Sequence, residues 1–173
     1  MEDLDPDHPL TLLLVPDADG PGRRHLLRAL GGRHAVVGPP RPWIDARSSY
    51  DRAARTLALR PGSRSGDPID SEQHLADLVL TADPAALADL RAQVLAPLAE
   101  LPLATRDRLS ETLLSWLLHQ GRRDDVAAEL HVHAQTVRYR MGQVRELYGD
   151  RLNDPRVVRE LVLALSAGGA PQH

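Results

Sequence analysis

The regular spacing of apolar residues between positions 84 and 165 limits the possible folds of this chain more than any other feature of its sequence. Apolar side chains recur there every three or four positions, which is the repeat of a helix that buries one face. Asp83-Pro84 and Asp154-Pro155 each place a capping carboxylate before a proline, a pairing typical of a helix start. The chain from Ser71 onward is therefore predicted to be helical throughout.

Three apolar faces define the helices expected in this part. Thr105 is predicted to cap the second helix, and Gly168-Gly169 to end the last one. The residues predicted to line the three faces are Leu87, Leu90, Val94 and Leu98, then Leu109, Leu113, Trp116 and Leu117, and finally Val158, Leu161, Val162 and Leu165. Apolar residues make up 42% of the whole chain, which is enough for a packed core.

The first 70 residues show a different pattern, in which short apolar runs alternate with helical spacing. Residues 10–15 (LTLLLV) form a continuous apolar run that predicts a buried strand, and residues 35–37 and the region of Ile69 predict two more. A helix is expected to start after Asp19, and another to be capped by Ser48 or Ser49. This alternation indicates an α/β layer, although two or three strands are few for an independent sheet.

Residues 124–141 have the layout of a helix-turn-helix motif. A short helix carries the small residue Ala127, which is needed where two helices cross closely. The turn His131-Val132-His133 follows, and His131 stands where many such motifs have a glycine. A second helix opens at Ala134, and Leu130, Val132 and Val137 are predicted to fill the wedge between the two helices.

The second helix of this motif is expected to bury one stripe and to expose the opposite face. At about 100° per residue, Met141, Val144 and Tyr148 lie within about 40° of Val137 and are predicted to be buried with it. The outward-facing residues are Gln135, Arg138, Tyr139, Gly142, Gln143 and Glu146, and Arg140 lies at the flank. The helix carries three arginines and no acidic residue from Ala134 to Arg145, which suits phosphates and base edges in a major groove.

The composition of the chain also bears on whether it binds DNA. All 21 basic residues are arginine, so the abundance of arginine is not in itself evidence for phosphate binding. The net charge of -3 argues against an indiscriminate nucleic-acid binder, because such proteins carry an excess of positive charge. The alternative function is a helical protein-interaction module that has kept the same fold but no longer binds DNA, and the net negative charge favours it slightly.

The segment from His133 to Met141 (HAQTVRYRM) resembles a signature of the C-terminal helix-turn-helix domain of PucR/CdaR-type bacterial transcriptional regulators. That signature is a histidine, two variable residues of which the second is usually asparagine, then threonine, an aliphatic residue, arginine, tyrosine, arginine and leucine. Gln135 replaces the usual asparagine and Ala134 a common arginine, and both changes bear on base preference and slightly favour the interaction module. Leu147-Tyr148-Gly149 and residues 152–155 also fall where the family has them.

A weaker resemblance covers residues 12–98, which are similar to the back half of the degenerate GGDEF-like domain that precedes this motif in many members. It rests on Val37-Gly38-Pro39 and on residues 49–53 and 95–98. The predicted class is therefore α+β, with a partial GGDEF-like α/β portion followed by an all-α helix-turn-helix domain. The predicted boundaries are residues 1–70 for the first portion, 71–104 for a helical linker, 105–168 for the DNA-binding domain and 169–173 for a disordered tail.

The predicted partner is double-stranded operator DNA, bound by a cytoplasmic homodimer that regulates transcription. Gln135, Arg138 and Tyr139 are candidates for base contacts, and Thr136, Arg140, Arg122 and His133 for phosphate contacts and positioning, with His133 capping the recognition helix. The apolar helix over residues 84–98 is a candidate dimer interface. The full set of predicted DNA-binding residues is Arg122, Arg123, His133, Ala134, Gln135, Thr136, Arg138, Tyr139, Arg140, Gly142, Gln143 and Arg145.

No cofactor, metal, membrane segment or catalytic residue is predicted, and the sequence points to no particular small-molecule effector. The chain has no cysteine, and His131, His133 and His119 are too few and too close in the turn for a zinc site. Asp124-Asp125 is interpreted as helix capping and dipole compensation rather than as an acid–base pair. The chain is therefore not expected to be an enzyme.

Overall fold

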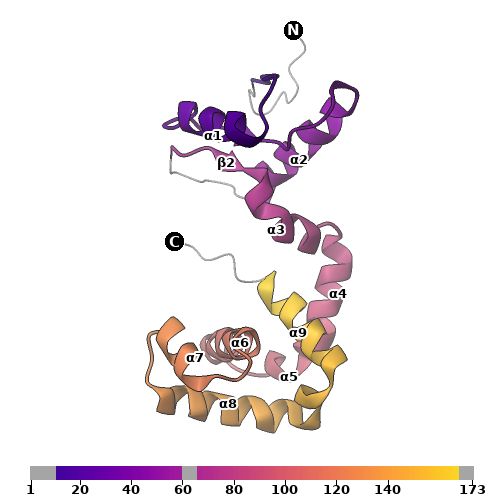
Figure 1. The fold of residues 1–173 in the computed structure, drawn as a ribbon. Coiled ribbons are helices and arrows are strands. Elements are labelled where there is room, and N and C mark those ends of the chain that lie inside the picture. The colour runs from indigo at the N-terminus through magenta and orange to yellow at the C-terminus, as the bar shows by residue number, and fades with distance from the viewer. Residues whose placement is uncertain (1–10, 60–65, 168–173) are drawn as a thin grey trace. The chain divides into compact units, whose positions relative to one another are not determined.

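The computed structural model of the chain describes residues 11–59 and 66–167. They form two compact units, of which unit 1 extends to Leu78 and unit 2 begins at Val79 (Figure 1). No helix in the described ranges is long and apolar enough to cross a membrane. The predicted domain boundaries stay predictions.

Unit 1 contains short helices and a minimal sheet. In chain order its elements are α1 (Gly20–Ala29), β1 (Val36–Val37), the 3-10 helix η1 (Trp43–Asp45), α2 (Ala46–Leu59), β2 (Ile69–Asp70), the 3-10 helix η2 (Ser71–His74) and the start of α3 (Leu75–Leu80). The two strands are parallel, with Val36 opposite Ile69 and Val37 opposite Asp70. The strands predicted near Val37 and Ile69 are thus confirmed, as is the helix start after Asp19. Two strands of two residues leave the GGDEF-like resemblance a prediction.

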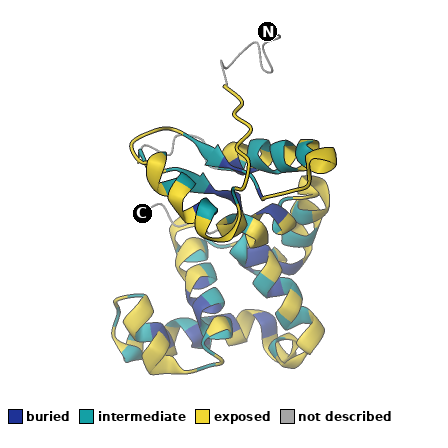
Figure 2. Cartoon of the chain, turned by 45° about the horizontal axis from the view of Figure 1, so that its top comes forward, coloured by how far each residue is buried: buried dark blue, intermediate teal, exposed yellow. Residues whose placement is uncertain are grey.

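Two other predictions for unit 1 are wrong. Thr11 to Val15 form no strand, and their side chains are exposed, as the segment leading into α1 shows in Figure 2. Leu10, the first residue of that predicted strand, lies outside the described residues. A strand needs a neighbour to pair with, and the short β1–β2 pair offers none to this segment. Ser48 and Ser49 lie inside α2, because that helix continues directly from η1.

A buried arginine that the sequence analysis did not single out holds unit 1 together. The Arg23 guanidinium donates from Nη1 to the Gly38 carbonyl at 2.9 Å and from Nε to Asp70 Oδ2 at 3.1 Å. Burial alone would raise the pKa of Asp70, but hydrogen bonds from Arg23 and from the Glu72 N–H, together with the Arg23 charge, outweigh it and hold that pKa below its ordinary value. Arg23 therefore joins α1 to both strands.

Unit 2 is helical throughout its described length, as predicted. Its elements are α4 (Pro84–Val94), α5 (Ala96–Ala99), α6 (Leu103–Leu118), α7 (Arg123–Glu129), α8 (Ala134–Tyr148), the 3-10 helix η3 (Gly149–Asn153) and α9 (Pro155–Ser166). Asp83 accepts from the Ala86 N–H at 3.0 Å and Asp154 from the Arg156 N–H at 2.8 Å, which confirms both predicted caps. Thr105 is not a cap, because the extended backbone of Pro102 starts α6 directly after it.

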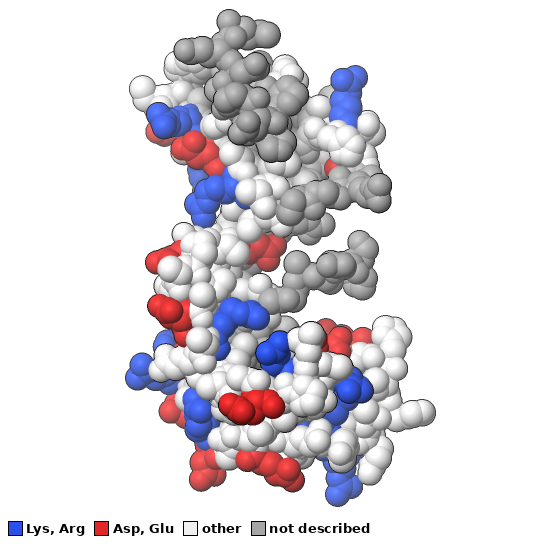
Figure 3. All heavy atoms as spheres, turned by 180° about the vertical axis from the view of Figure 1, so that it is seen from behind, with Lys and Arg blue, Asp and Glu red and all other residues white. Residues whose placement is uncertain are grey.

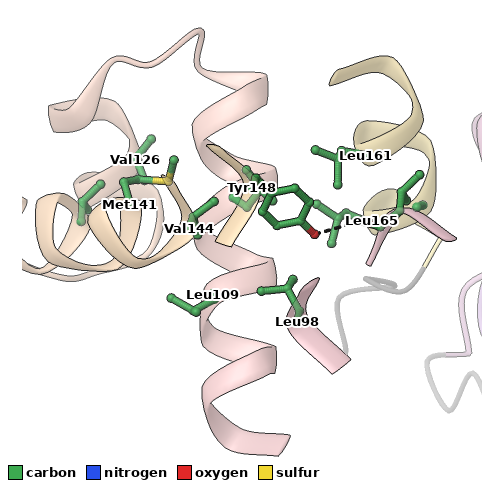
Figure 4. Packing of buried hydrophobic residues seen from close by; sticks show 12 residues of the cluster. Leu98, Leu109, Val126, Met141, Val144, Tyr148, Leu161 and Leu165 are labelled. Carbon is green, nitrogen blue, oxygen red and sulfur yellow. Dashed lines mark hydrogen bonds between the residues drawn. The ribbon is translucent and has the colours of Figure 1, made fainter. Parts of the chain in front are cut away.

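One hydrophobic core joins all the helices of unit 2. Helix α4 packs on α9, and α6 packs on both α8 and α9. Figure 4 shows the Tyr148 ring between Val144 and the α9 leucines Leu161 and Leu165. The buried members of the core are Val94, Leu98, Leu109, Leu113, Val126, Val137, Met141, Val144, Tyr148, Leu161, Ala164 and Leu165.

The core of unit 2 also occupies the apolar side of the helix proposed as a dimer interface. Val94 and Leu98 are buried, and Leu90 packs against the same core. The exposed residues of α4 are mainly alanines together with Asp89 and Gln93. Leu90, Val94 and Leu98 are therefore not available for a dimer contact.

Candidate nucleic-acid interface

The turn between α7 and α8 is tight because α7 ends in a left-handed residue. His131 has φ +51°, and the next N–H, that of Val132, reaches back to the Ala127 carbonyl at 3.0 Å. The His131 N–H itself points to the Ala128 carbonyl at 3.3 Å, so the two bonds form a Schellman cap. His131 thus occupies a backbone conformation that favours glycine, the residue that many helix-turn-helix motifs have at this position.

The wedge between α7 and α8 is filled by the predicted residues. Val137 is fully buried, and Leu130 and Val132 are half-buried and pack against the core. Ala127 also packs there, and its small side chain lets the helices approach. The contact between α7 and α8 is therefore made by the residues that the sequence pattern identified.

The two faces of α8 also divide as predicted. Val137, Met141, Val144 and Tyr148 are all buried, with exposed fractions of 0 to 3%. Gln135 and Arg138 are exposed, and Tyr139 exposes 67% of its surface. Gly142 and Gln143 are half-exposed, and a Cβ added at Gly142 would meet no atom within 4 Å. In Figure 1, α8 runs along the lower edge of unit 2, with α6 and α7 on one side of it.

The three arginines of α8 have different surroundings. Arg140 is half-buried, and its Nη1 donates to Thr112 Oγ1 of α6 at 3.2 Å. The guanidinium of Arg145 lies 5.3 Å from the centre of the Trp116 ring, within cation–π range. Arg138 makes no hydrogen bond or ion pair with any residue that the structure describes. Its donors are therefore free to meet a ligand.

The two arginines at the start of α7, Arg122 at the N-cap and Arg123 in the first turn, are exposed but lie beside carboxylates. Arg122 Nε is 3.4 Å from Asp125, and Arg123 Nε is 3.7 Å from Asp124. Both aspartates lie in the first turn of α7, where they oppose the helix dipole as predicted, but neither caps the helix, because Arg122 is at the N-cap. Basic and acidic side chains are interspersed over the face of unit 2 that Figure 3 shows.

His133 is the N-cap residue of α8, but its side chain makes no capping hydrogen bond. The Thr136 N–H instead meets the His133 backbone carbonyl at 2.8 Å. The predicted position of His133 is thus right and the predicted cap is wrong, because the imidazole accepts from none of the first N–H groups of α8. The ring is exposed, and Ala134 and Thr136 beside it are half-buried.

A polar cluster between α6 and α7 was missed by the sequence analysis. Ser115 Oγ donates to Glu129 Oε2, and His119 Nε2 lies 3.1 Å from the same oxygen. In a hydrolytic triad the histidine lies between serine and acid, whereas here the carboxylate lies between the other two. The arrangement activates no nucleophile and instead ties α7 to α6. No cluster able to hold a metal ion is found among the described residues.

Comparison with known proteins agrees with this geometry. Residues 109–167 match the family model of the PucR C-terminal helix-turn-helix domain. The chain is 29% identical over 147 residues to uncharacterized proteins of Mycobacterium bovis and Mycobacterium tuberculosis, a match that covers 84% of this chain and 34% of each relative. It is 39% identical over 69 residues to an uncharacterized protein from the region 5′ of pkwA in Thermomonospora curvata, covering 38% of each chain. The chain thus spans about a third of the length of the curated relatives it matches.

Proposed function

We propose that this protein is a sequence-specific DNA-binding transcriptional regulator that places α8 in a major groove. The observation that carries the proposal is the exposed face of α8, where Gln135, Arg138 and Tyr139 lie together directly after a tight helix-turn-helix turn. A helix in this position is the element that enters the groove in helix-turn-helix proteins. The match of residues 109–167 to the PucR domain supports the same role, which is not enzymatic.

The residues of this face divide by the chemistry of their side chains. Arg138 can donate two hydrogen bonds to a guanine edge, and Gln135 can pair with adenine in the same way. Tyr139 offers a ring and a hydroxyl beside them, and Gly142 lets the helix backbone come close to the DNA. The proposed residues for phosphate contacts and positioning are Arg122, His133, Thr136 and Arg140. The other residues proposed to lie at the DNA interface are Arg123, Ala134, Gln143 and Arg145.

We further propose that the protein binds its operator as a homodimer. One recognition helix covers only a few base pairs, which is too little for selectivity in a genome. Two copies related by a two-fold axis would place their recognition helices about 34 Å apart, or a multiple of that distance. Light scattering of the protein on its operator tests this, and a single copy per operator would refute it.

Selection of bound duplexes from a random DNA pool tests the function itself. We expect recovery of an inverted repeat that binds about 10³-fold or more tightly than mixed-sequence DNA at the same salt concentration. A parallel fluorescence titration with mixed genomic DNA at low and moderate salt shows the non-specific affinity. Failure to enrich any sequence, together with no binding at low salt, would overturn the proposal in favour of a helical protein-interaction module.

A further inference from the structure

The hydrogen bond between Arg140 and Thr112 connects the recognition helix to α6. Thr112 is fully buried, and its Oγ1 donates to the Arg108 carbonyl at 2.8 Å. A threonine hydroxyl has one proton, so the oxygen has only lone pairs left to offer any other group. Arg140 Nη1 donates to that oxygen at 3.2 Å. Because the hydroxyl proton points to the Arg108 carbonyl, the Thr112 oxygen can accept a hydrogen bond from Arg140.

This bond differs in kind from the apolar packing between α6 and α8. Leu109 and Leu113 meet the buried stripe of α8 through apolar packing, which has no preferred direction. Within the described residues, Arg140–Thr112 is the only side-chain hydrogen bond between these two helices. A directional bond at the flank of α8 resists rotation of the helix about its axis. Rotation of about 10–20° is enough to spoil a binding geometry.

From these contacts we infer that Arg140 is a positioning residue, which acts on DNA binding through Thr112 and does not contact a phosphate. The inference rests on the proposed function and narrows the role of one residue within it. Arg138, two positions earlier, provides the contrast, because it is exposed and makes no bond within the described part of the chain. One helix therefore holds an arginine that reads DNA and another that sets the helix in place.

The test separates the two roles by the salt dependence of binding. Each phosphate contact contributes about 0.9 to the slope of log K against log salt, whereas a positioning residue leaves the slope unchanged. The probe is the fluorescein-labelled duplex recovered by the selection described above. Its affinity is measured over a series of salt concentrations for the full chain and for the variants Thr112→Val, Thr112→Ser and Arg140→Ala.

Thr112→Val removes the hydroxyl without changing the charge of Arg140, and Thr112→Ser is its matched control. We expect Thr112→Val and Arg140→Ala to lose affinity about 3- to 30-fold with unchanged slopes, and Thr112→Ser to bind like the parent. The double variant Thr112→Val/Arg140→Ala should bind no worse than either single variant, because both remove the same bond. Far-UV circular dichroism and urea unfolding confirm that each variant is folded.

Two results overturn the inference while leaving the proposed function in place. One is a slope reduced by about 0.9 in Arg140→Ala together with unchanged binding by Thr112→Val, which would make Arg140 a phosphate contact. The other is tighter binding and a steeper slope in Thr112→Val, which would show that the released arginine reaches the backbone. If the parent chain binds no duplex at any salt concentration, the proposed function fails and this inference with it.

Discussion

Replacing Tyr148 by phenylalanine should destabilise unit 2 at neutral pH. The buried Tyr148 hydroxyl donates to the Val94 carbonyl at 3.0 Å and so joins the end of α8 to α4, as the dashed line in Figure 4 shows. Phenylalanine keeps the ring but leaves that carbonyl without the bond. The net loss for one such hydrogen bond is about 1–2 kcal/mol in the free energy of unfolding.

The same hydroxyl makes this difference depend on pH. Burial raises the pKa of Tyr148 to about 12, although the nearby Arg151 charge opposes the shift. A tyrosine in the unfolded chain has a pKa of about 10, so the unfolded state loses its proton first. The stabilisation is fully present below pH 10 and is lost as the pH rises through 12. At pH 11 the free energy of unfolding of the wild-type chain should have fallen by about 1.4 kcal/mol from its value at neutral pH.

The chain is well suited to this measurement because it has no lysine and no cysteine, whose side chains titrate near this range. The chain has three tyrosines, and these are the side chains that titrate in this pH range. Tyr139→Phe is the matched control, because Tyr139 is 67% exposed. Urea unfolding is followed by the fluorescence of Trp116 in a Trp43→Phe background, which leaves one tryptophan.

We expect the deficit of Tyr148→Phe relative to the parent to shrink from about 1–2 kcal/mol at pH 8 to near zero at pH 11. Tyr139→Phe should stay within about 0.5 kcal/mol of the parent at pH 8. A deficit of the same size at both pH values would refute the assigned pKa shift. Equal stability of Tyr148→Phe and the parent at pH 8 would refute the hydrogen bond.

Four further outcomes are expected. Arg138→Ala combined with Tyr139→Ala should weaken specific DNA binding by about 1–3 kcal/mol per lost base contact while hardly changing the melting temperature, and equal losses of binding and stability would contradict the face assignment. Gly142→Ala should raise the free energy of unfolding by up to about 1 kcal/mol, because the added Cβ meets open space. Gly142→Gln should keep the fold but lower the affinity for DNA, and unchanged affinity would disprove a close approach of the helix backbone to the DNA. His131→Gly should raise the melting temperature by relieving about 1 kcal/mol of left-handed strain, and a lower melting temperature would contradict this. Asp70→Asn should lower the free energy of unfolding of unit 1, measured in urea, by about 3 kcal/mol at neutral pH. The loss should be smaller below pH 4, because the lowered pKa of Asp70 makes its stabilising contribution present above about pH 4 and lost as the pH falls.

The sequence by itself determined the features of unit 2 that depend on local periodicity and turn chemistry. The buried stripe of α8 follows from the helical repeat, so Val137, Met141 and Tyr148 could be assigned without any neighbour being known. The caps at Asp83 and Asp154 are similarly local, because a carboxylate meets N–H groups only two or three residues away. The exposed face with Gln135 and Arg138 is the complement of that stripe.

Only the tertiary structure decided what each polar side chain of that domain meets. Arg138, Arg140 and Arg145 are chemically identical in the sequence, yet the partners of the last two, Thr112 and Trp116, lie 28 and 29 positions earlier. Residues 11–15 fail as a strand for the same reason, since strand formation depends on a neighbour that a local pattern does not specify. Pairing between distant residues depends on how the helices cross and on which strands are present, and neither is contained in local spacing.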